Sequence, residues 1–161
     1  MATKAMVAIV LAVSASCSEG SVDRPVSTPP ATSTITVEQE AALVAKAEEM
    51  AFYDDEPSPT RPMAVATTWE EVAGAGLGTA GARSPDRTVL VASLEGSFVG
   101  YLAKVPSGED VPTGTHLWFI MDAERLQVLG WELGNEAIDL AAMGEPFPLP
   151  IHTPITEASF G

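Results

Sequence analysis

The sequence predicts an α+β fold in which one N-terminal amphipathic helix packs on a four-to-five-stranded antiparallel meander sheet. Two observations support this prediction: one long helical stripe begins near residue 36, and short β-like segments with short connections follow up to residue 133. The chain length agrees, because 161 residues suffice for one domain of roughly 100–150 residues. We place this single domain at residues 36–145.

The helix is predicted to begin at a capping box and to end near Tyr53. In Thr36-Val-Glu-Gln39, the hydroxyl and amide side chains can satisfy exposed backbone donors. Residues 54–59, which read Asp-Asp-Glu-Pro-Ser-Pro, cannot continue a helix. Glu48 is assigned, with other charged residues, to the side that faces solvent. An apolar stripe with helical spacing is assigned to the sheet side and comprises Leu43, Val44, Ala47, Met50 and Ala51.

The sheet is predicted from runs that are rich in valine and other strand-forming residues. Glu95-Gly96 is interpreted as a tight turn between two of its strands. One run is apolar on both faces and is therefore expected at a central or covered position. The expected strands are Met63–Thr67, Thr88–Leu94, Phe98–Val105, Thr115–Met121 and Leu126–Leu133.

Two short helices are expected beside the sheet. Thr68-Trp-Glu-Glu71 is a second capping box and predicts a helix around Trp69–Ala73. Asn135 is expected to cap a last helix at Glu136–Met143.

Residues 1–16 have the pattern of a signal peptide. Lys4 provides a positive start, and Ala5–Val13 is an uncharged apolar run. As a helix this run would cover about 14 Å, or half the hydrocarbon core of a bilayer. We therefore interpret it as an export signal, with a buried N-terminal helix of a cytoplasmic protein as the alternative.

Cys17, the only cysteine of the chain, directly follows this segment. Val13-Ser14-Ala15-Ser16-Cys17 resembles a bacterial lipobox, although Ser14 stands where an aliphatic residue is usual. The resemblance implies that Cys17 is lipidated and becomes the mature N-terminus, so that the lipid bilayer is a partner. The expected location is extracytoplasmic and lipid-anchored at the cell membrane, and ordinary secretion is the alternative.

Proline-rich segments flank the predicted domain. Residues 17–35 are interpreted as a flexible tether, because residues 18–34 are rich in Ser, Thr and Pro and contain almost nothing large and apolar. Residues 146–161 are interpreted as a Pro-rich C-terminal tail, of which Phe147 and Leu149 are expected to pack back on the domain, with Ile151 as a further candidate.

The charge balance excludes several partners. The chain has 22 acidic and 8 basic residues and a net charge of −14, which becomes −15 if residues 1–16 are removed with Lys4. Nucleic-acid binding needs a basic footprint, so we expect no nucleic-acid partner. The same balance argues against a basic face that binds anionic lipid.

Part of the domain resembles the closing hairpin of PepSY-type domains. An apolar strand is followed by Asp122-Ala123 at a turn and then by Val128-Leu129, although Arg125-Leu126 stand where those domains usually carry a glycine. This resemblance implies a helix on an antiparallel sheet, and an exported protease or another envelope protein as partner.

Several short motifs also occur in the order found in a family of small bacterial lipoproteins that supplies no catalytic residues. They are Thr67-Thr68, Leu94-Glu-Gly96-x-Phe98, Pro112-x-Gly114, Asp122-Ala123, Gly130-Trp-x-Leu133 and Asp139-Leu140.

The sequence contains no assembled catalytic or metal-binding motif. The two histidines, His116 and His152, lie 36 positions apart, and HExxH, CxxC and GxSxG are absent. We therefore assign no catalytic residue, no metal ligand and no cofactor. A small envelope hydrolase or metal-dependent enzyme is the alternative, in which His116 would act with a nearby carboxylate such as Asp122 or Glu109.

The aromatic residues suggest a binding surface. Strand alternation places Trp118 and Phe119 on opposite faces of the sheet, so the second face is either covered by the C-terminal tail or presents an apolar patch. We name Trp118, Trp131 and Tyr101 as a candidate partner-binding face. The leading interpretation is a non-catalytic interaction module at the bacterial cell envelope, and a carrier of an apolar ligand is a further alternative.

Overall fold

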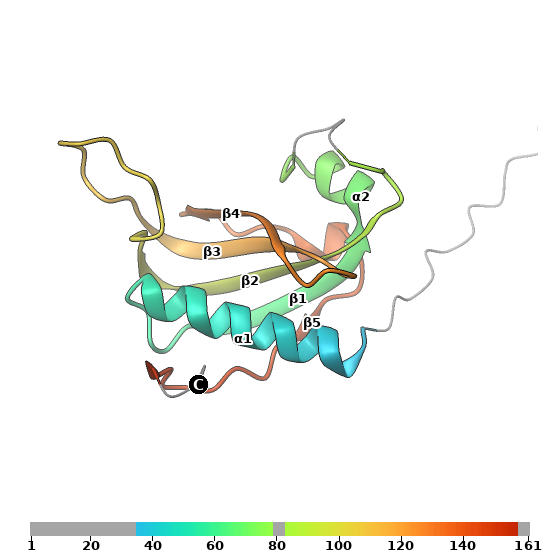
Figure 1. Ribbon diagram of the computed structural model, residues 1–161, viewed down its shortest axis with the longest axis horizontal. Coiled ribbons are helices and arrows are strands. Elements are labelled where there is room, and N and C mark those ends of the chain that lie inside the picture. The colour runs from blue at the N-terminus through green and yellow to red at the C-terminus, as the bar shows by residue number, and fades with distance from the viewer. Residues whose placement is uncertain (1–34, 79–82, 158–161) are drawn as a thin grey trace, which may run out of the picture.

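The computed structural model describes residues 35–78 and 83–157 of the chain (Figure 1). Helix α1 packs on a five-stranded antiparallel sheet, which confirms the predicted α+β class. The signal peptide, Cys17 and the tether up to residue 34 lie outside the described residues. The helices are α1 (Val37–Tyr53), α2 (Trp69–Gly74) and the 3₁₀ helix η1 (Leu140–Ala142). The strands are β1 (Thr60–Thr68), β2 (Thr88–Val99), β3 (Thr113–Asp122), β4 (Val128–Gly134) and β5 (Phe147–Pro148).

The sheet has the strand order β4-β3-β2-β1-β5. Strands β1 to β4 follow one another as the predicted meander. Strand β5 comes from the Pro-rich tail and pairs with β1, where Phe147 lies opposite Ala64 and Pro148 opposite Met63. Leu149 is buried beyond β5, so the expectation that the tail packs back on the domain is confirmed.

Both capping boxes form as predicted. The Thr36 hydroxyl accepts from the Gln39 backbone N–H at 3.1 Å, and the Gln39 side chain accepts from the Thr36 backbone N–H at 2.8 Å. Thr68 and Glu71 repeat this exchange at the start of α2. These signals involve residues only three positions apart, so they depend little on the rest of the fold.

The predicted turn at Glu95-Gly96 is wrong, and so is the strand Phe98–Val105. Strand β2 runs through this point as one strand of 12 residues. Two of its residues, Gly96 and Ser97, face a single residue of β3, which is the geometry of a β-bulge. The Glu56 carboxylate holds the bulge, because its Oε2 accepts from the Ser97 backbone N–H at 2.5 Å. The chain leaves the sheet after Val99, and residues 100–112 form the β2–β3 loop.

Apolar side chains pack on both faces of the sheet. On the α1 face, the core includes Leu43 and Phe119 together with Leu149 and Ile155 of the tail. The tail therefore covers the α1 side, and of the two alternatives given for the opposite face, coverage by the tail is wrong. Residues of α2 and the η1 region cover that opposite face, where the second core contains Val65, Trp69, Val72, Val89, Val91, Trp118, Ile120, Leu140 and Met143.

The last predicted helix is shorter than expected. Only Leu140–Ala142 is helical, and its cap is Asp139, whose Oδ1 accepts from the Ala141 and Ala142 backbone N–H groups. Asn135 is not the cap. In the two stretches that the structure describes, no helix is long and apolar enough to cross a bilayer.

Candidate functional site

The structure does not bring Trp118, Trp131 and Tyr101 to one face. Trp118 is only 7% exposed and belongs to the core opposite α1. Trp131 pairs with Phe119 and packs, partly buried, on the α1 side. The predicted common face is therefore wrong, because neighbouring strand positions alternate between the two sides of the sheet. Tyr101 lies in the β2–β3 loop and is 61% exposed.

Tyr101 instead belongs to a surface at the C-terminal end of α1. The described residues include five exposed large apolar side chains. Three of them lie in the β2–β3 loop, and a fourth, Tyr53, ends the helix that this loop contacts through Asp54. We call these four residues, Tyr53, Tyr101, Leu102 and Val111, the end surface. The fifth, Val37, lies in the first turn of α1, at the opposite end of the helix.

Backbone hydrogen bonds fix the loop residues of the end surface. The Gly100 N–H donates to the Pro112 carbonyl at 2.8 Å, which joins the two ends of the loop next to Tyr101 and Val111. The Leu102 N–H donates to Asp54 Oδ1 at 3.3 Å, and Tyr53 directly precedes this aspartate. The loop and the helix end therefore form one surface.

Asp54 is the buried support of this surface. It caps α1, its side chain is fully buried, and its backbone carbonyl accepts from the Val99 N–H at 2.8 Å. Burial raises the pKa of the Asp54 carboxyl above its usual value, because desolvation outweighs the hydrogen bonds from the Leu102 and Tyr101 backbone. Within the part of the chain that the structure describes, Asp54 Oδ2 has no hydrogen-bond partner.

We expect Asp54→Asn to stabilise the protein at neutral pH by on the order of 1 kcal/mol, the scale of one hydrogen-bonding group. A carboxyl with a raised pKa binds its proton more tightly in the folded state, so wild-type stability falls as the pH rises above the unfolded value of 3.8. The difference in unfolding free energy between Asp54→Asn and the wild type should therefore disappear below pH 3.8. Urea unfolding from pH 3 to 8 measures this, with the exposed neighbour Asp55→Asn as control.

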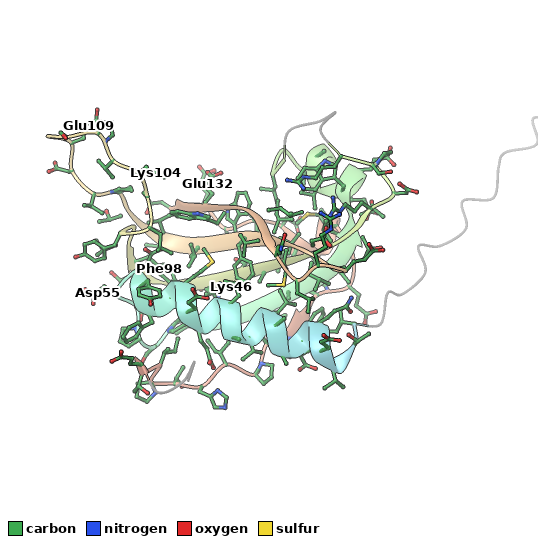
Figure 2. The ribbon with its side chains drawn as sticks, viewed as in Figure 1. Lys46, Asp55, Phe98, Lys104, Glu109 and Glu132 are labelled. Atoms are coloured by element: carbon green, nitrogen blue, oxygen red, sulfur yellow. The ribbon has the colours of Figure 1, made fainter. Side chains whose placement is uncertain are left out.

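Acidic residues adjoin the end surface in the sequence. Asp55 follows the buried Asp54, and Glu109 and Asp110 lie in the same loop as Tyr101. Figure 2 shows Asp55 and Glu109 at the loop end of the molecule, Lys104 in the same loop, and Glu132 on the neighbouring β4. Apolar groups with a mainly acidic rim can bind a segment that carries both apolar and basic side chains.

A second candidate site lies on the sheet face opposite α1. A cavity of about 260 Å³ opens between strands β1 to β3 and the segment that contains η1. Its charged end is formed by Arg61, Glu95 and His116, and Ser93 adds a hydroxyl. The apolar part of the lining consists of Met63, Ala137, Ile138, Leu140, Ala141 and Pro146.

The cavity shows which carboxylate accompanies His116. Register places Glu95 opposite His116, and the distance from Glu95 Oε1 to His116 Nε2 is 3.9 Å. Asp122 lies at the other end of the same strand, so the expected partners Asp122 and Glu109 are replaced by Glu95. Arg61 Nη1 also contacts Glu95 Oε1, at 3.3 Å. At 3.9 Å the histidine and the carboxylate attract electrostatically but do not form a hydrogen bond.

The cavity does not assemble a metal site. Across residues 35–78 and 83–157, no group of three or more His, Cys, Asp or Glu side chains could hold a metal ion. The His116 Nδ1 atom lies 3.0 Å from the Thr115 hydroxyl, so a neighbouring Oγ is within hydrogen-bond reach of the ring. The cavity can thus offer a polar end and an apolar wall to a small ligand.

Sequence reasoning missed two buried acids. Glu48 was placed on the solvent side of α1 but is only 2% exposed, because the C-terminal tail passes over it. The buried Asp54 supports the end surface, and its helix-ending position was the only signal in the sequence. No family model, curated protein or solved structure matches this chain.

Proposed function

We propose that this protein is a lipid-anchored, extracytoplasmic module of the bacterial cell envelope that binds a protein partner and performs no catalysis. The observation that carries the proposal is the end surface: four of the five exposed large apolar side chains of the described residues belong to the β2–β3 loop or to the end of α1 that this loop contacts. Apolar side chains grouped on a surface in this way mark interaction sites. The lone Cys17 behind an export-like segment supports the anchor.

The end surface is suitably placed for an anchored protein. The sequence of the tether joins the domain at Thr36, where α1 starts, and the end surface lies where α1 stops at Tyr53. A helix of 17 residues is about 25 Å long. The anchor and the binding surface are therefore at opposite ends of α1, which leaves the surface accessible to another envelope component.

The charge of the protein defines the chemistry of the partner. At −14 overall, the chain attracts basic segments and repels acidic ones. Because the end surface combines aromatic and aliphatic groups with an acidic rim, we assign it a segment that alternates basic with apolar residues. Such binding should weaken as the salt concentration rises, since the rim charges are exposed.

The anchor is tested by the mass of the full chain expressed in a bacterial host. We expect the wild type to be shortened at Cys17 and to carry acyl chains, and to partition into the membrane fraction. Cys17→Ala should lack the acyl mass and leave the membrane. An unmodified Cys17 on a soluble mature chain would contradict the anchor.

Binding is tested by photo-crosslinking in intact envelopes. A photoreactive phenylalanine analogue at position 101 should form an adduct with a protein that contains a basic, apolar segment. Val37 is the matched control, because it is 84% exposed and apolar but lies at the far end of α1. Equal adducts from both positions, or none from position 101, would contradict the proposal.

A second candidate function is a small hydrolase or ligand carrier that uses the cavity of Arg61, Glu95 and His116. The observation in its favour is that His116 lines the cavity with a carboxylate, Glu95, at 3.9 Å, and that Ser93 adds a hydroxyl to the same lining. This candidate predicts that His116→Ala abolishes hydrolysis of ester or amide substrates without lowering stability. Absence of any hydrolysis by the wild type, together with unchanged crosslinking by His116→Ala, would favour the interaction module.

A further inference from the structure

We propose that the partner binds as an extended strand that pairs with the free edge of β4 and continues the sheet. Strand β4 is at one end of the strand order and pairs only with β3. Apart from this ladder, residues 128–134 make no backbone hydrogen bond to any other described residue. The N–H and C=O groups that face away from β3 are therefore available to a further strand.

The available edge is the segment Gly130–Gly134. The one irregularity of the β3–β4 ladder is at Leu129, which has no counterpart on β3. Beyond it, five consecutive residues pair regularly with β3, from Gly130 opposite Ile120 to Gly134 opposite His116. A regular stretch of this length can template the pairing of a short peptide.

The side chains of this segment protect the edge only by one charge, that of Glu132. Sheet edges are commonly blocked by Lys or Pro, and residues 130–134 contain neither; Glu132 is their only charged residue. Trp131 and Leu133 are only partly buried on the α1 side. Helix α1 packs mainly on β2, two strands away from β4, so the outer edge of β4 lies beyond the helix.

The β4 edge is continuous with the end surface. A side chain added at Gly100 would meet the Leu133 side chain at 3.0 Å and Pro112 at 3.1 Å, so the loop base packs on the last residues of β4. The base of the loop that carries the end surface therefore adjoins the end of β4. This inference rests on the proposed function and adds to it the backbone conformation of the partner.

Charge favours a basic segment over a second copy of this chain. Antiparallel pairing of two β4 edges would place two acidic molecules, each with a net charge of −14, against each other. The same pairing would bring the two Glu132 side chains close together, and like charges across a strand pair destabilise it. An extended segment with Lys or Arg beside apolar residues meets no such repulsion.

The experiment uses the full-length chain and a nine-residue probe peptide that alternates Lys with Val. A second peptide has the same side chains, but two adjacent central amides are N-methylated, so that one blocked N–H faces each edge of the strand. We expect the first peptide to bind and the methylated peptide to bind at least about tenfold more weakly. On binding, the amides of Gly130–Gly134 that face away from β3 should gain about tenfold protection from hydrogen exchange.

The outcomes separate this inference from the proposed function. Equal binding of both peptides, without new protection in β4, would overturn strand addition and leave the end surface as the binding site. No binding of either peptide would contradict both. A dimer of the free protein that already protects Gly130–Gly134 would assign the edge to a second copy and overturn the proposed occupant. A peptide with Glu in place of Lys should bind more weakly, and equal binding would contradict the role of charge.

Discussion

Asp122→Ala should destabilise the protein by about 2–3 kcal/mol, the scale of removing a buried charged acceptor from its donors. The Asp122 side chain is buried at the end of β3 and forms an ion pair with Arg87. Its Oδ1 also accepts from the backbone N–H groups of Glu124 and Arg125, at 2.9 and 2.7 Å. Alanine would leave the guanidinium and both N–H groups without their partner. Urea unfolding at pH 7 measures the loss.

Asp139→Ala is a matched control for this variant. The Asp139 carboxylate likewise accepts from two backbone N–H groups, at 3.1 and 3.3 Å, but it is exposed and caps only a short helix. Loss of an exposed cap costs about 1 kcal/mol. A loss at Asp122 no larger than that at Asp139 would show that burial and the Arg87 ion pair add little, contrary to our expectation.

Short-range signals were reliable in this chain because their partners are close in sequence. Both capping boxes involve residues three positions apart, and the proline-containing segment that ends α1 acts on its own backbone. The α+β class followed from these signals and from the valine-rich runs. By contrast, Arg87 and Asp122 are 35 positions apart, and nothing local indicates that they pair.

The wrong predictions concern contacts that depend on strand register and on which segments pack over each face of the sheet. Glu95-Gly96 has the composition of a turn, but Glu56, from the α1–β1 connection, holds the chain as a bulge. Alternation correctly separated Trp118 from Phe119, yet it could not show that the η1 region buries Trp118. His116 was paired with the wrong acids, because the β2–β3 register alone determines that Glu95 lies opposite it.

The candidate binding site was predictable only in part. Tyr101 was named from the sequence, and its exposure places it in the end surface. Tyr53 ends a helix whose limits were predicted, but its proximity to Leu102 depends on the Asp54 hydrogen bond across 48 positions. The sequence alone can therefore identify single residues of the end surface, but the conformation of the β2–β3 loop determines which residues come together.

Glu48→Ala should destabilise the protein by about 2–3 kcal/mol, because a buried charged acceptor would be removed from its donors. Glu48 Oε1 accepts from the His152 backbone N–H at 2.6 Å and lies 2.7 Å from the His152 ring Nδ1. Two further bonds hold the same tail, from the Leu149 N–H to the Pro62 carbonyl and from the Ile155 N–H to the Pro57 carbonyl. The Glu48 carboxylate thus fastens the C-terminal tail to α1.

Variants of Glu48 and His152 distinguish the contribution of the His152 backbone N–H bond from that of the His152 ring. His152→Ala keeps the backbone N–H bond to Glu48, and the His152 side chain is 78% exposed, so we expect a loss of about 1 kcal/mol. Glu48→Gln keeps an acceptor and should lie between the two alanine variants. Unfolding free energies and hydrogen exchange at residues 149–155 measure both effects, and Glu48→Ala should speed exchange throughout this segment. If Glu48→Ala and His152→Ala cost the same, the exposed ring rather than the buried backbone bond would hold the tail, and its attachment would then depend on a solvent-exposed side chain.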